Sequence, residues 1–208
     1  MKGFFRNCGK LFTLAFVSAL LFNCSGNQSD VTSTEEDVLK KQELSVLGQE
    51  DPFSLIGQEW MLITAGDTSK FNTMTASWGG LAWMWDRPVA FIFVRPERYT
   101  HEFIEQNDRL TLSFFKEEYR KALQICGTKS GRDCDKVKEA GLTPVSMASG
   151  TTSFEEARMV LDCKKLFKTE MTDSAFIDRS VRERWYNDQP GGGFHTIYIV
   201  EIEDVYSK

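Results

Sequence analysis

Residues Asn72–Asn107 read NTMTASWGGLAWMWDRPVAFIFVRPERYTHEFIEQN, and this stretch decides the fold. It contains two runs rich in β-branched and aromatic residues, NTMTASWGG and PVAFIFVRP, which are bounded by Gly, Pro or Asn as strands commonly are. Comparable runs occur outside it in GQEWMLITAG, RLTLSFF and HTIYIVEIEDVY. Several short strands with small helical insertions predict a mainly β fold, a closed or split antiparallel barrel that removes exposed sheet edges.

The predicted helical insertions lie between these strands. Apolar residues recur at helical spacing over residues 119–126 and more weakly over residues 137–140. Residues 153–171 fit two patterns, because a Ser-x-x-Glu capping box favours a helix whereas the apolar residues after it alternate as in a strand. The family resemblance described below favours the strand.

Hydroxyl groups and aromatic rings are concentrated in the first of the quoted runs. On a strand, Thr75 and Ser77 lie on one side and Ala76 and Trp78 on the other. A planar ring with a polar edge and a phosphate tail is bound by hydrogen-bonding groups, apolar cover and cationic donors together. The segment from Thr75 to Trp78 supplies the first two of these.

The cationic donors are supplied by the RPERYT segment, residues 95–100. Pro96 disfavours a helical conformation at Arg95, and Thr100 has the hydroxyl expected of the N-cap of a short helix over residues 101–104. The free amide groups at such a helix start attract anions. We therefore expect a phosphate group near Arg98 and Thr100.

Three blocks in this order resemble the flavin reductase-like family of FMN-binding split barrels, and most closely its flavoredoxin-type branch. They are NTMTASWGG at 72–80, VRPERYTHEFI at 94–104 and CGTKSGRDCDK at 126–136, followed by GLTPV at 141–145. The resemblance covers residues from about 53 to 206. It implies a Greek-key, FMN-binding split β-barrel with short helical insertions that forms a homodimer. FMN is the implied cofactor and NAD(P)H the implied electron donor, in an oxidoreductase that passes a hydride to the flavin and electrons onward.

The resemblance also assigns site residues. Those implied to bind FMN are Thr75, Ala76, Ser77, Trp78, Arg95, Arg98, Tyr99, Thr100, Lys129 and Ser130. Arg98 and Thr100 are assigned to the phosphate first and Arg95 second, while the loop with Lys129 and Ser130 closes over the cofactor or approaches its phosphate. His195, before the last strand, is implied to border the nicotinamide.

Alternatives remain for these assignments. Thr, Ser and Trp residues also favour strands and fill cores, and the arginines could form surface pairs with Glu97 or Glu102. His195 could be an ordinary surface histidine. For the whole protein, the alternatives are an FMN-containing electron carrier with a protein redox partner and a non-redox ligand-binding lipoprotein. Export favours the carrier, since free NAD(P)H should be scarce outside the cytoplasm.

The N-terminus predicts an exported protein. Three basic residues precede a mostly apolar run at 11–22, which is too short for a comfortable membrane span and suits a signal peptide. LFNC at 21–24 resembles a bacterial lipobox, although Asn23 replaces the usual Gly or Ala. We therefore expect residues 1–23 to be a signal peptide and a lipid on Cys24 to anchor the mature protein to a membrane of the cell envelope. An uncleaved anchor or a plain secretory signal is the alternative.

Residues 24–51 are expected to form a flexible tether, because from Ser25 to Asp51 they contain no aromatic residue and few apolar ones. A short helix is the alternative there. The folded domain is then expected over residues 52–208. Without residues 1–23 the chain keeps 22 basic and 30 acidic residues, a formal net charge of −8. This charge argues against a general nucleic-acid surface.

The cysteine pattern does not predict a metal site. Cys126, Cys134 and Cys163 lack the paired spacing of zinc ligands, and the two histidines do not cluster with them. A Cys126–Cys134 disulfide is compatible with the spacing. We expect buried free thiols instead, because free cysteine is among the most often buried residue types.

Overall fold

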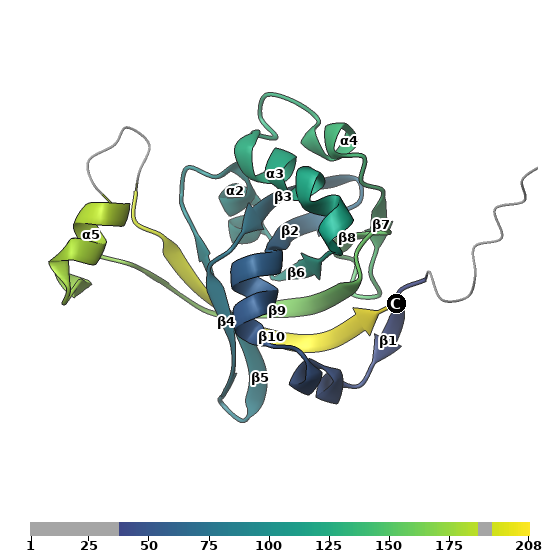
Figure 1. Cartoon of the computed structure of the whole chain (residues 1–208), viewed down its shortest axis with the longest axis horizontal. Coiled ribbons are helices and arrows are strands. Elements are labelled where there is room, and N and C mark those ends of the chain that lie inside the picture. The colour runs from purple at the N-terminus through teal and green to yellow at the C-terminus, as the bar shows by residue number, and fades with distance from the viewer. Residues whose placement is uncertain (1–37, 187–192) are drawn as a thin grey trace, which may run out of the picture. The chain divides into compact units, whose positions relative to one another are not determined.

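The computed structural model describes residues 38–186 and 193–208, and its centre is an antiparallel sheet of eight strands (Figure 1). Seven strands follow the order β3-β2-β6-β9-β10-β5-β4, and β1 pairs with β10. Their bounds are β1 Lys40–Gln42, β2 Met61–Asp67, β3 Lys70–Ala76, β4 Gly79–Met84, β5 Arg87–Val94, β6 Arg109–Phe114, β9 Met159–Glu170 and β10 Thr196–Ser207. A hairpin of β7 (Pro144–Ser146) and β8 (Thr152–Phe154) forms a second sheet. The mainly β prediction is confirmed.

The first and last strands of this order, β3 and β4, are consecutive in the chain. Only Ser77 and Trp78 separate Ala76 from Gly79. Three steps between successive Cα atoms span no more than about 11 Å. The sheet therefore curves until its two ends meet at this connection, which we call the seam (Ser77 and Trp78).

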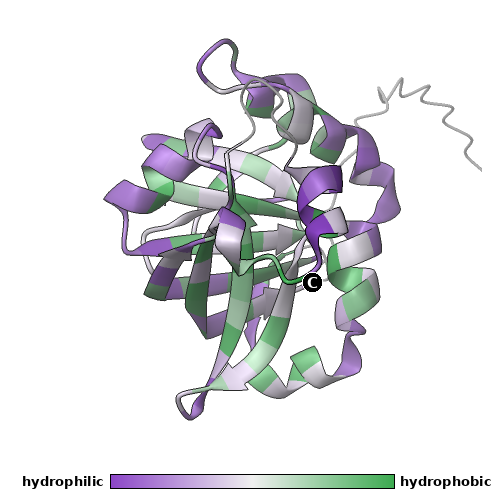
Figure 2. Cartoon of the chain, turned by 90° about the vertical axis from the view of Figure 1, so that its left-hand side faces the viewer, coloured by the Kyte–Doolittle hydropathy of each residue, from purple (hydrophilic) through white to green (hydrophobic). Residues whose placement is uncertain are grey.

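Both faces of the sheet are covered at β2 and at the first half of β9, where residues that point to opposite sides are all buried. Along β2, Ile63 belongs to one apolar cluster and Leu62 to another, and β9 repeats this with Leu161 and Val160. The second cluster includes apolar residues of α3 and β8. Figure 2 shows the apolar residues along the strands and more hydrophilic residues on the helices.

Short helices lie around the sheet. They are α1 Pro52–Ser54, α2 Tyr99–Gln106, α3 Arg120–Thr128, α4 Lys136–Ala140 and α5 Arg179–Trp185. The helices predicted at 119–126 and 137–140 correspond to α3 and α4. Gly141 ends α4 in a left-handed conformation, with φ of 69°. In the described part of the chain, none of the helices has the length and apolar character of a membrane span.

The ambiguous residues 153–171 form strands, as the resemblance favoured. The capping-box residues do not start a helix, because each has another partner. The hydroxyl of Ser153, in β8, lies 2.9 Å from that of Ser113, and the carboxylate of Glu156 accepts from the backbone N–H of Thr143 at 3.0 Å. Tertiary contacts thus decide between the helical and the strand pattern, which the local sequence supports equally.

The expected flexible tether is wrong for its last part. Lys40–Gln42 pairs with β10, and Leu44–Gln49 forms a 3-10 helix. Arg158 Nη1 lies 2.9 Å from Glu50 Oε1, and its Nη2 lies 2.7 Å from Glu59 Oε2. The segment needs few apolar residues because it adds to an existing sheet and is held by this arginine. Residues 24–37, the predicted signal peptide and Cys24 lie outside the described residues.

Candidate functional site

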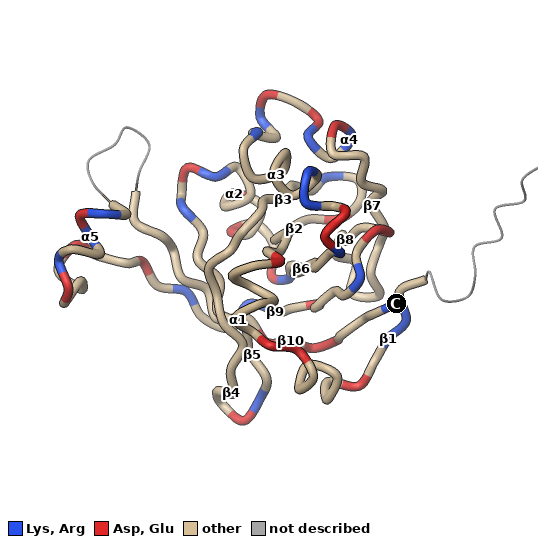
Figure 3. The backbone as a smooth tube through the Cα atoms, in the orientation of Figure 1, with Lys and Arg blue, Asp and Glu red and all other residues tan. Residues whose placement is uncertain are grey.

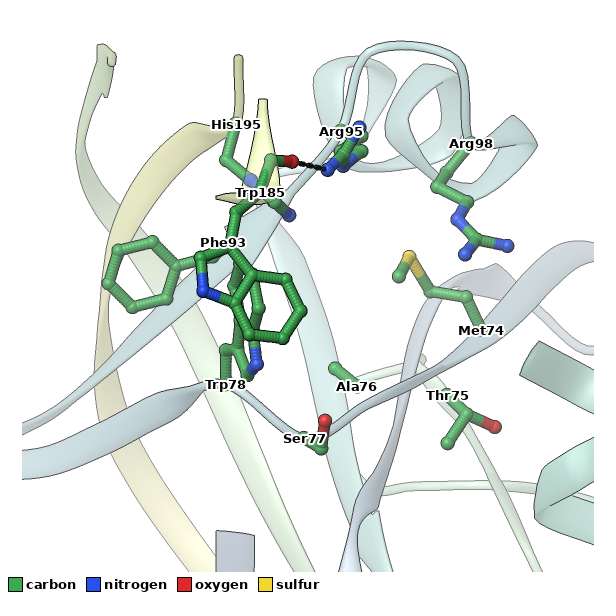
Figure 4. A pocket seen from close by; sticks show the side chains of 10 residues that line it. All are labelled: Met74, Thr75, Ala76, Ser77, Trp78, Phe93, Arg95, Arg98, Trp185 and His195. Atoms are coloured by element: carbon green, nitrogen blue, oxygen red, sulfur yellow. Dashed lines mark hydrogen bonds between the residues drawn. The ribbon is translucent and has the colours of Figure 1, made fainter. Parts of the chain in front are cut away.

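The seam borders a cavity of about 230 Å³, which we call the ring cavity (Figure 4). Its lining residues are Met74, Thr75, Ala76, Ser77, Trp78, Phe93, Arg95, Arg98, Trp185 and His195. They come from β3 and the seam, from the end of β5 and the loop after it, from the end of α5, and from the residue before β10. The curved sheet thus brings together segments that are far apart in the sequence.

The two sides of the ring cavity differ in chemistry. One side, which we call the aromatic wall, consists of Trp78, Phe93, Trp185 and His195. Met74 and Arg98 lie on the opposite side in Figure 4. The Trp78 and Trp185 rings meet edge to face with centroids 5.1 Å apart, and the Trp78 and His195 centroids are 5.2 Å apart. Among the described residues that line this cavity there is no carboxylate.

A second cavity of about 110 Å³, which we call the anion cavity, adjoins the first, because Met74 and Arg98 line both. Its other lining residues are Glu97, Tyr99, Thr100, Thr128, Lys129, Ser130 and Lys136. Figure 3 shows basic residues both in the loop before α2 and in the loop between α3 and α4. Three cationic side chains against one carboxylate suit this cavity to an anion.

Arg98 and Lys136 are held at the anion cavity by backbone carbonyl groups. Arg98 Nη1 donates to the oxygen of Gly127 at 2.8 Å, and Lys136 Nζ donates to the oxygens of Cys126 at 3.1 Å and Lys129 at 3.2 Å. Lys136 is only 5% exposed, and burial lowers its pKa. A buried ammonium with neutral acceptors is stabilised by a nearby anion. The side chain of Lys129 is less available, because it forms an ion pair with Glu139.

Thr75 and Ser77 do not present their hydroxyls side by side. The hydroxyl of Thr75 donates to the backbone oxygen of Leu123 in α3. In Figure 4 its side chain points away from the aromatic wall, whereas Ser77 lies at the cavity. Strand alternation does not extend to Ser77, because β3 ends at Ala76. Of these two predicted hydroxyls, only that of Ser77 remains well placed for a ligand.

The prediction that Thr100 caps a helix is wrong. Helix α2 begins at Tyr99, after Arg98 in an extended conformation, and no side chain caps it. Thr100 is buried in the first turn, where its hydroxyl accepts from Nδ2 of Asn72 at 2.7 Å. The buried amide of Asn72 requires such an acceptor, so the hydroxyl of Thr100 is engaged in a hydrogen bond inside the protein.

Arg95 holds the end of α5. Its Nη2 donates to the backbone oxygen of Trp185 at 2.9 Å, and its guanidinium lies 5.2 Å from the ring centroid of Tyr186. Arg95 lines the ring cavity and is absent from the lining of the anion cavity. The structure thus gives this arginine a contact that positions Trp185.

His195 is buried at the ring cavity, so it is not an ordinary surface histidine. Its side chain is 8% exposed, and its Nδ1 lies 2.7 Å from the hydroxyl of Tyr186. Burial, together with the positive charge of Arg95, lowers the pKa of His195 to about 4. The ring is therefore neutral near pH 7, with Nδ1 engaged by the hydroxyl of Tyr186.

Each residue assigned to FMN or nicotinamide from the sequence lines one of the two cavities. Sequence reasoning missed Met74, Phe93, Trp185 and Lys136. Lys136 closes the CGTKSGRDCDK block, so that block was a signal for it. No comparable signal existed for Trp185, because its place at the cavity depends on the position of α5.

The three cysteines of the described residues are free thiols. Cys126 and Cys163 are buried, as predicted, while Cys134 is half-buried. Burial raises the pKa of Cys126 to about 11, so this residue is a thiol at neutral pH. Within the described residues, no group of three or more His, Cys, Asp or Glu side chains could hold a metal ion.

Comparison with known proteins agrees with this architecture. The flavin reductase-like domain family matches residues 53–208. Among solved structures, an FMN-binding domain of a flavin reductases-like enzyme from Shewanella baltica has a TM-score of 0.58 at 17% identity, over 81% of this chain and 76% of that chain. Flavoredoxin of Desulfovibrio vulgaris (Miyazaki F) has a TM-score of 0.56 at 23% identity, over 72% of this chain and 69% of that chain.

A third similar structure is the FMN-binding protein from Thermus thermophilus with bound p-hydroxybenzaldehyde. Its TM-score is 0.54 at 18% identity, over 72% of this chain and 71% of that chain. Among curated proteins, none matches this chain. The family match and these structures confirm the predicted fold, a mainly β split barrel with short helices.

Proposed function

Because this chain belongs to the flavin reductase-like domain family, we propose that it is an FMN-binding oxidoreductase that moves a hydride from NAD(P)H to the flavin and passes electrons onward. The observation that carries the proposal is that the two cavities adjoin, with Met74 and Arg98 lining both. FMN has the same division, with a planar ring at one end and a phosphate at the other. The donor set of the anion cavity fits a phosphate, and the aromatic and apolar groups of the ring cavity fit a flavin.

Particular residues would hold FMN. Arg98 and Lys136 offer cationic N–H groups to the phosphate, and Ser77 offers a hydroxyl near the ring. Met74 provides apolar cover at the junction of the two cavities. When bound, FMN supplies a ring that accepts a hydride. The chain binds and orients the reactants and excludes water, and His195 would border the nicotinamide.

The test uses the full chain loaded with FMN. Under anaerobic conditions, NADH or NADPH should bleach the flavin, and His195→Ala should slow this bleaching without changing reduction by dithionite. His101→Ala is the matched control, because His101 is the other histidine and its Nε2 contacts Thr196 Oγ1 at 3.1 Å instead of lining the ring cavity. Absence of FMN uptake at micromolar concentrations would contradict the flavin proposal and favour a non-redox ligand-binding protein.

An electron carrier with a protein redox partner is the second candidate. The side chains of Trp78 and Trp185 are 37% and 44% exposed at the rim of the ring cavity, where a partner protein could approach. If neither nucleotide bleaches the flavin, yet the protein cycles with dithionite and air, the carrier replaces the reductase.

We also propose that the protein is exported, lipidated on Cys24 and homodimeric. The lipobox-like LFNC supports the lipid anchor. The dimer is supported by apolar surface beside β4, where Trp83 is 71% exposed and borders an apolar groove of about 440 Å³ with Leu44 and Leu81. Light scattering of the purified protein measures the oligomeric state.

A further inference from the structure

We infer that Glu139 sets how tightly the anion cavity holds a phosphate, because Glu139 competes with that phosphate for Lys129. Glu139 is absent from the described lining of both cavities, whereas Lys129 lines the anion cavity. Glu139 would therefore act through Lys129, as a positioning residue. The inference rests on the proposed function, since the phosphate of FMN is the ligand that would occupy the cavity, and it adds a residue that controls release of the flavin.

The cationic side chains that line the anion cavity are held in two different ways. Arg98 and Lys136 donate to backbone carbonyl oxygens. Lys129 donates instead to the carboxylate of Glu139, on helix α4. A carbonyl oxygen carries no net charge, whereas a carboxylate and a phosphate are both anions that bind an ammonium group strongly. Lys129 is therefore the cation for which the protein and the ligand compete.

The ion pair between Lys129 and Glu139 is exposed, with 48% and 40% of the two side chains accessible to solvent. Their hydrogen bond raises the pKa of Lys129 and lowers the pKa of Glu139, so both are charged at neutral pH. An exposed ion pair shifts an equilibrium by less than about 5-fold, and a hydrogen bond to a charged group by about 10- to 100-fold. A phosphate can therefore draw Lys129 away from Glu139, while the broken pair offsets part of the gain.

Lys129 can change partners without moving its backbone. Its backbone N–H donates to the oxygen of Ile125 at 3.0 Å, and its backbone oxygen accepts from Lys136 Nζ at 3.2 Å. The lysine side chain is a flexible four-carbon stem that ends in an ammonium group. Rotation of this stem would carry the ammonium group from Glu139 into the cavity that Lys129 lines.

The charges at the anion cavity indicate that the phosphate is held less tightly than it could be. Arg98, Lys129 and Lys136 are opposed by Glu97 in the lining and by Glu139 behind Lys129. One positive charge thus remains to balance a phosphate monoester, which carries about −1.5 to −2 at pH 7. Glu139 therefore favours release and exchange of the flavin.

The test measures flavin binding to the full chain by quenching of flavin fluorescence, and FMN release by stopped-flow dilution. Glu139→Gln removes the charge but keeps the size and the helix propensity of the side chain. This change should tighten FMN about 2- to 5-fold and slow its release by a similar factor, because the competing ion pair is lost. Riboflavin has no phosphate, so its affinity should stay the same.

A second substitution shows whether Glu139 acts through Lys129. Lys129→Met keeps an unbranched stem without the charge, and it should weaken FMN about 3- to 10-fold. In this background Glu139→Gln should no longer tighten FMN. Glu117→Gln is the matched control, because Glu117 also forms an exposed ion pair, with Arg120. It should leave FMN affinity unchanged, and circular dichroism checks the folding of each variant.

Two outcomes would overturn the inference. One is unchanged FMN affinity in Glu139→Gln. The other is equal tightening by this change with and without Lys129, which would mean that Glu139 acts only through its long-range charge.

The inference and the proposed function can fail separately. If the wild type does not take up FMN, the proposed function fails, and the same variants are titrated with inorganic phosphate by calorimetry. Tightening of phosphate by Glu139→Gln that depends on Lys129 would retain the inference. Absence of phosphate binding would overturn the inference as well.

Discussion

The hydroxyl of Tyr186 lies 2.7 Å from Nδ1 of His195, and this contact joins the end of α5 to the last strand of the sheet. The guanidinium of Arg95 lies 5.2 Å from the centroid of the Tyr186 ring. The protonation state of His195 is therefore controlled by residues that also position the aromatic wall.

His195 is expected to titrate near pH 4 in NMR spectra of the histidine side chains, below the ordinary value of 6.5. Arg95→Ala should raise this pKa because it removes a positive charge. The folded state prefers the neutral ring, so the contribution of His195 to stability is complete above pH 6.5 and declines as the pH falls toward 4. In urea unfolding at pH 7, 5 and 4, the free energy of unfolding should fall less with decreasing pH for His195→Phe than for the wild type. A wild-type pKa at or above 6.5 would contradict this.

Arg98→Ala is expected to weaken FMN binding by about 1.5 to 3 kcal/mol, the scale of a hydrogen bond to a charged group. The loss of affinity should be smaller for riboflavin, which lacks the phosphate. Arg95→Ala is the matched control, because Arg95 lies outside the lining of the anion cavity and should affect both flavins alike. If Arg98→Ala weakens riboflavin and FMN equally, Arg98 does not bind the phosphate.

Arg158→Met is expected to lower the free energy of unfolding by about 1 to 3 kcal/mol, because it leaves Glu50 and Glu59 without their partly buried cation. Arg87→Met is the control, since Arg87 pairs with Glu201 at a more exposed site. That change should cost about 0 to 1 kcal/mol. If denaturant titrations show equal losses of unfolding free energy for the two variants, Arg158 does not fix residues 40–50 to the sheet.

Asp86→Gly is expected to stabilise the protein by about 0.5 to 1 kcal/mol. Trp85 and Asp86 form the two-residue turn between β4 and β5, with φ of 54° and 56°. This left-handed conformation is strained for residues with a Cβ atom, and glycine adopts it freely. Glu155→Gly, in a turn without positive φ, should not raise the melting temperature.

Cys24→Ser is expected to move the full-length protein from the membrane fraction to the soluble fraction or to leave it unprocessed. Stable anchoring depends on acyl chains whose burial contributes about 0.8 kcal/mol per methylene. Cys8→Ser, in the predicted signal peptide, is the control. Equal detergent partitioning of wild type and Cys24→Ser would exclude lipid anchoring at this position.

The parts of the fold that follow from local pattern were predictable. The runs around β2, β3, β5, β6 and β10 have strand composition, and α3 and α4 have helical spacing. The motif blocks predicted Arg98, Ser77 and Lys129, because residues that are close together in a short motif remain close together in the folded site.

The parts that depend on distant contacts were not predictable from the same patterns. Residues 40–50 contain few apolar residues, and they are held by pairing with β10, by packing of Val46 and Leu47 against the core and by Arg158. The hydroxyl of Thr100 was predicted as a helix cap, but its hydrogen-bond partner is Asn72, in strand β3. Trp185 reaches the site through the position of α5, and Arg95 holds its backbone oxygen there.

The seam affects how stable this protein is in a cell. A ligand that contacts Ser77 and Trp78 together with Arg98 would help to hold the two ends of the sheet together. Its binding energy would then resist opening of the whole sheet, and a saturating ligand at 100 times its Kd adds about 2.7 kcal/mol to the stability of the folded state. Chains that fail to acquire the ligand would open and be degraded sooner. We therefore expect the amount of this protein to follow the supply of its cofactor.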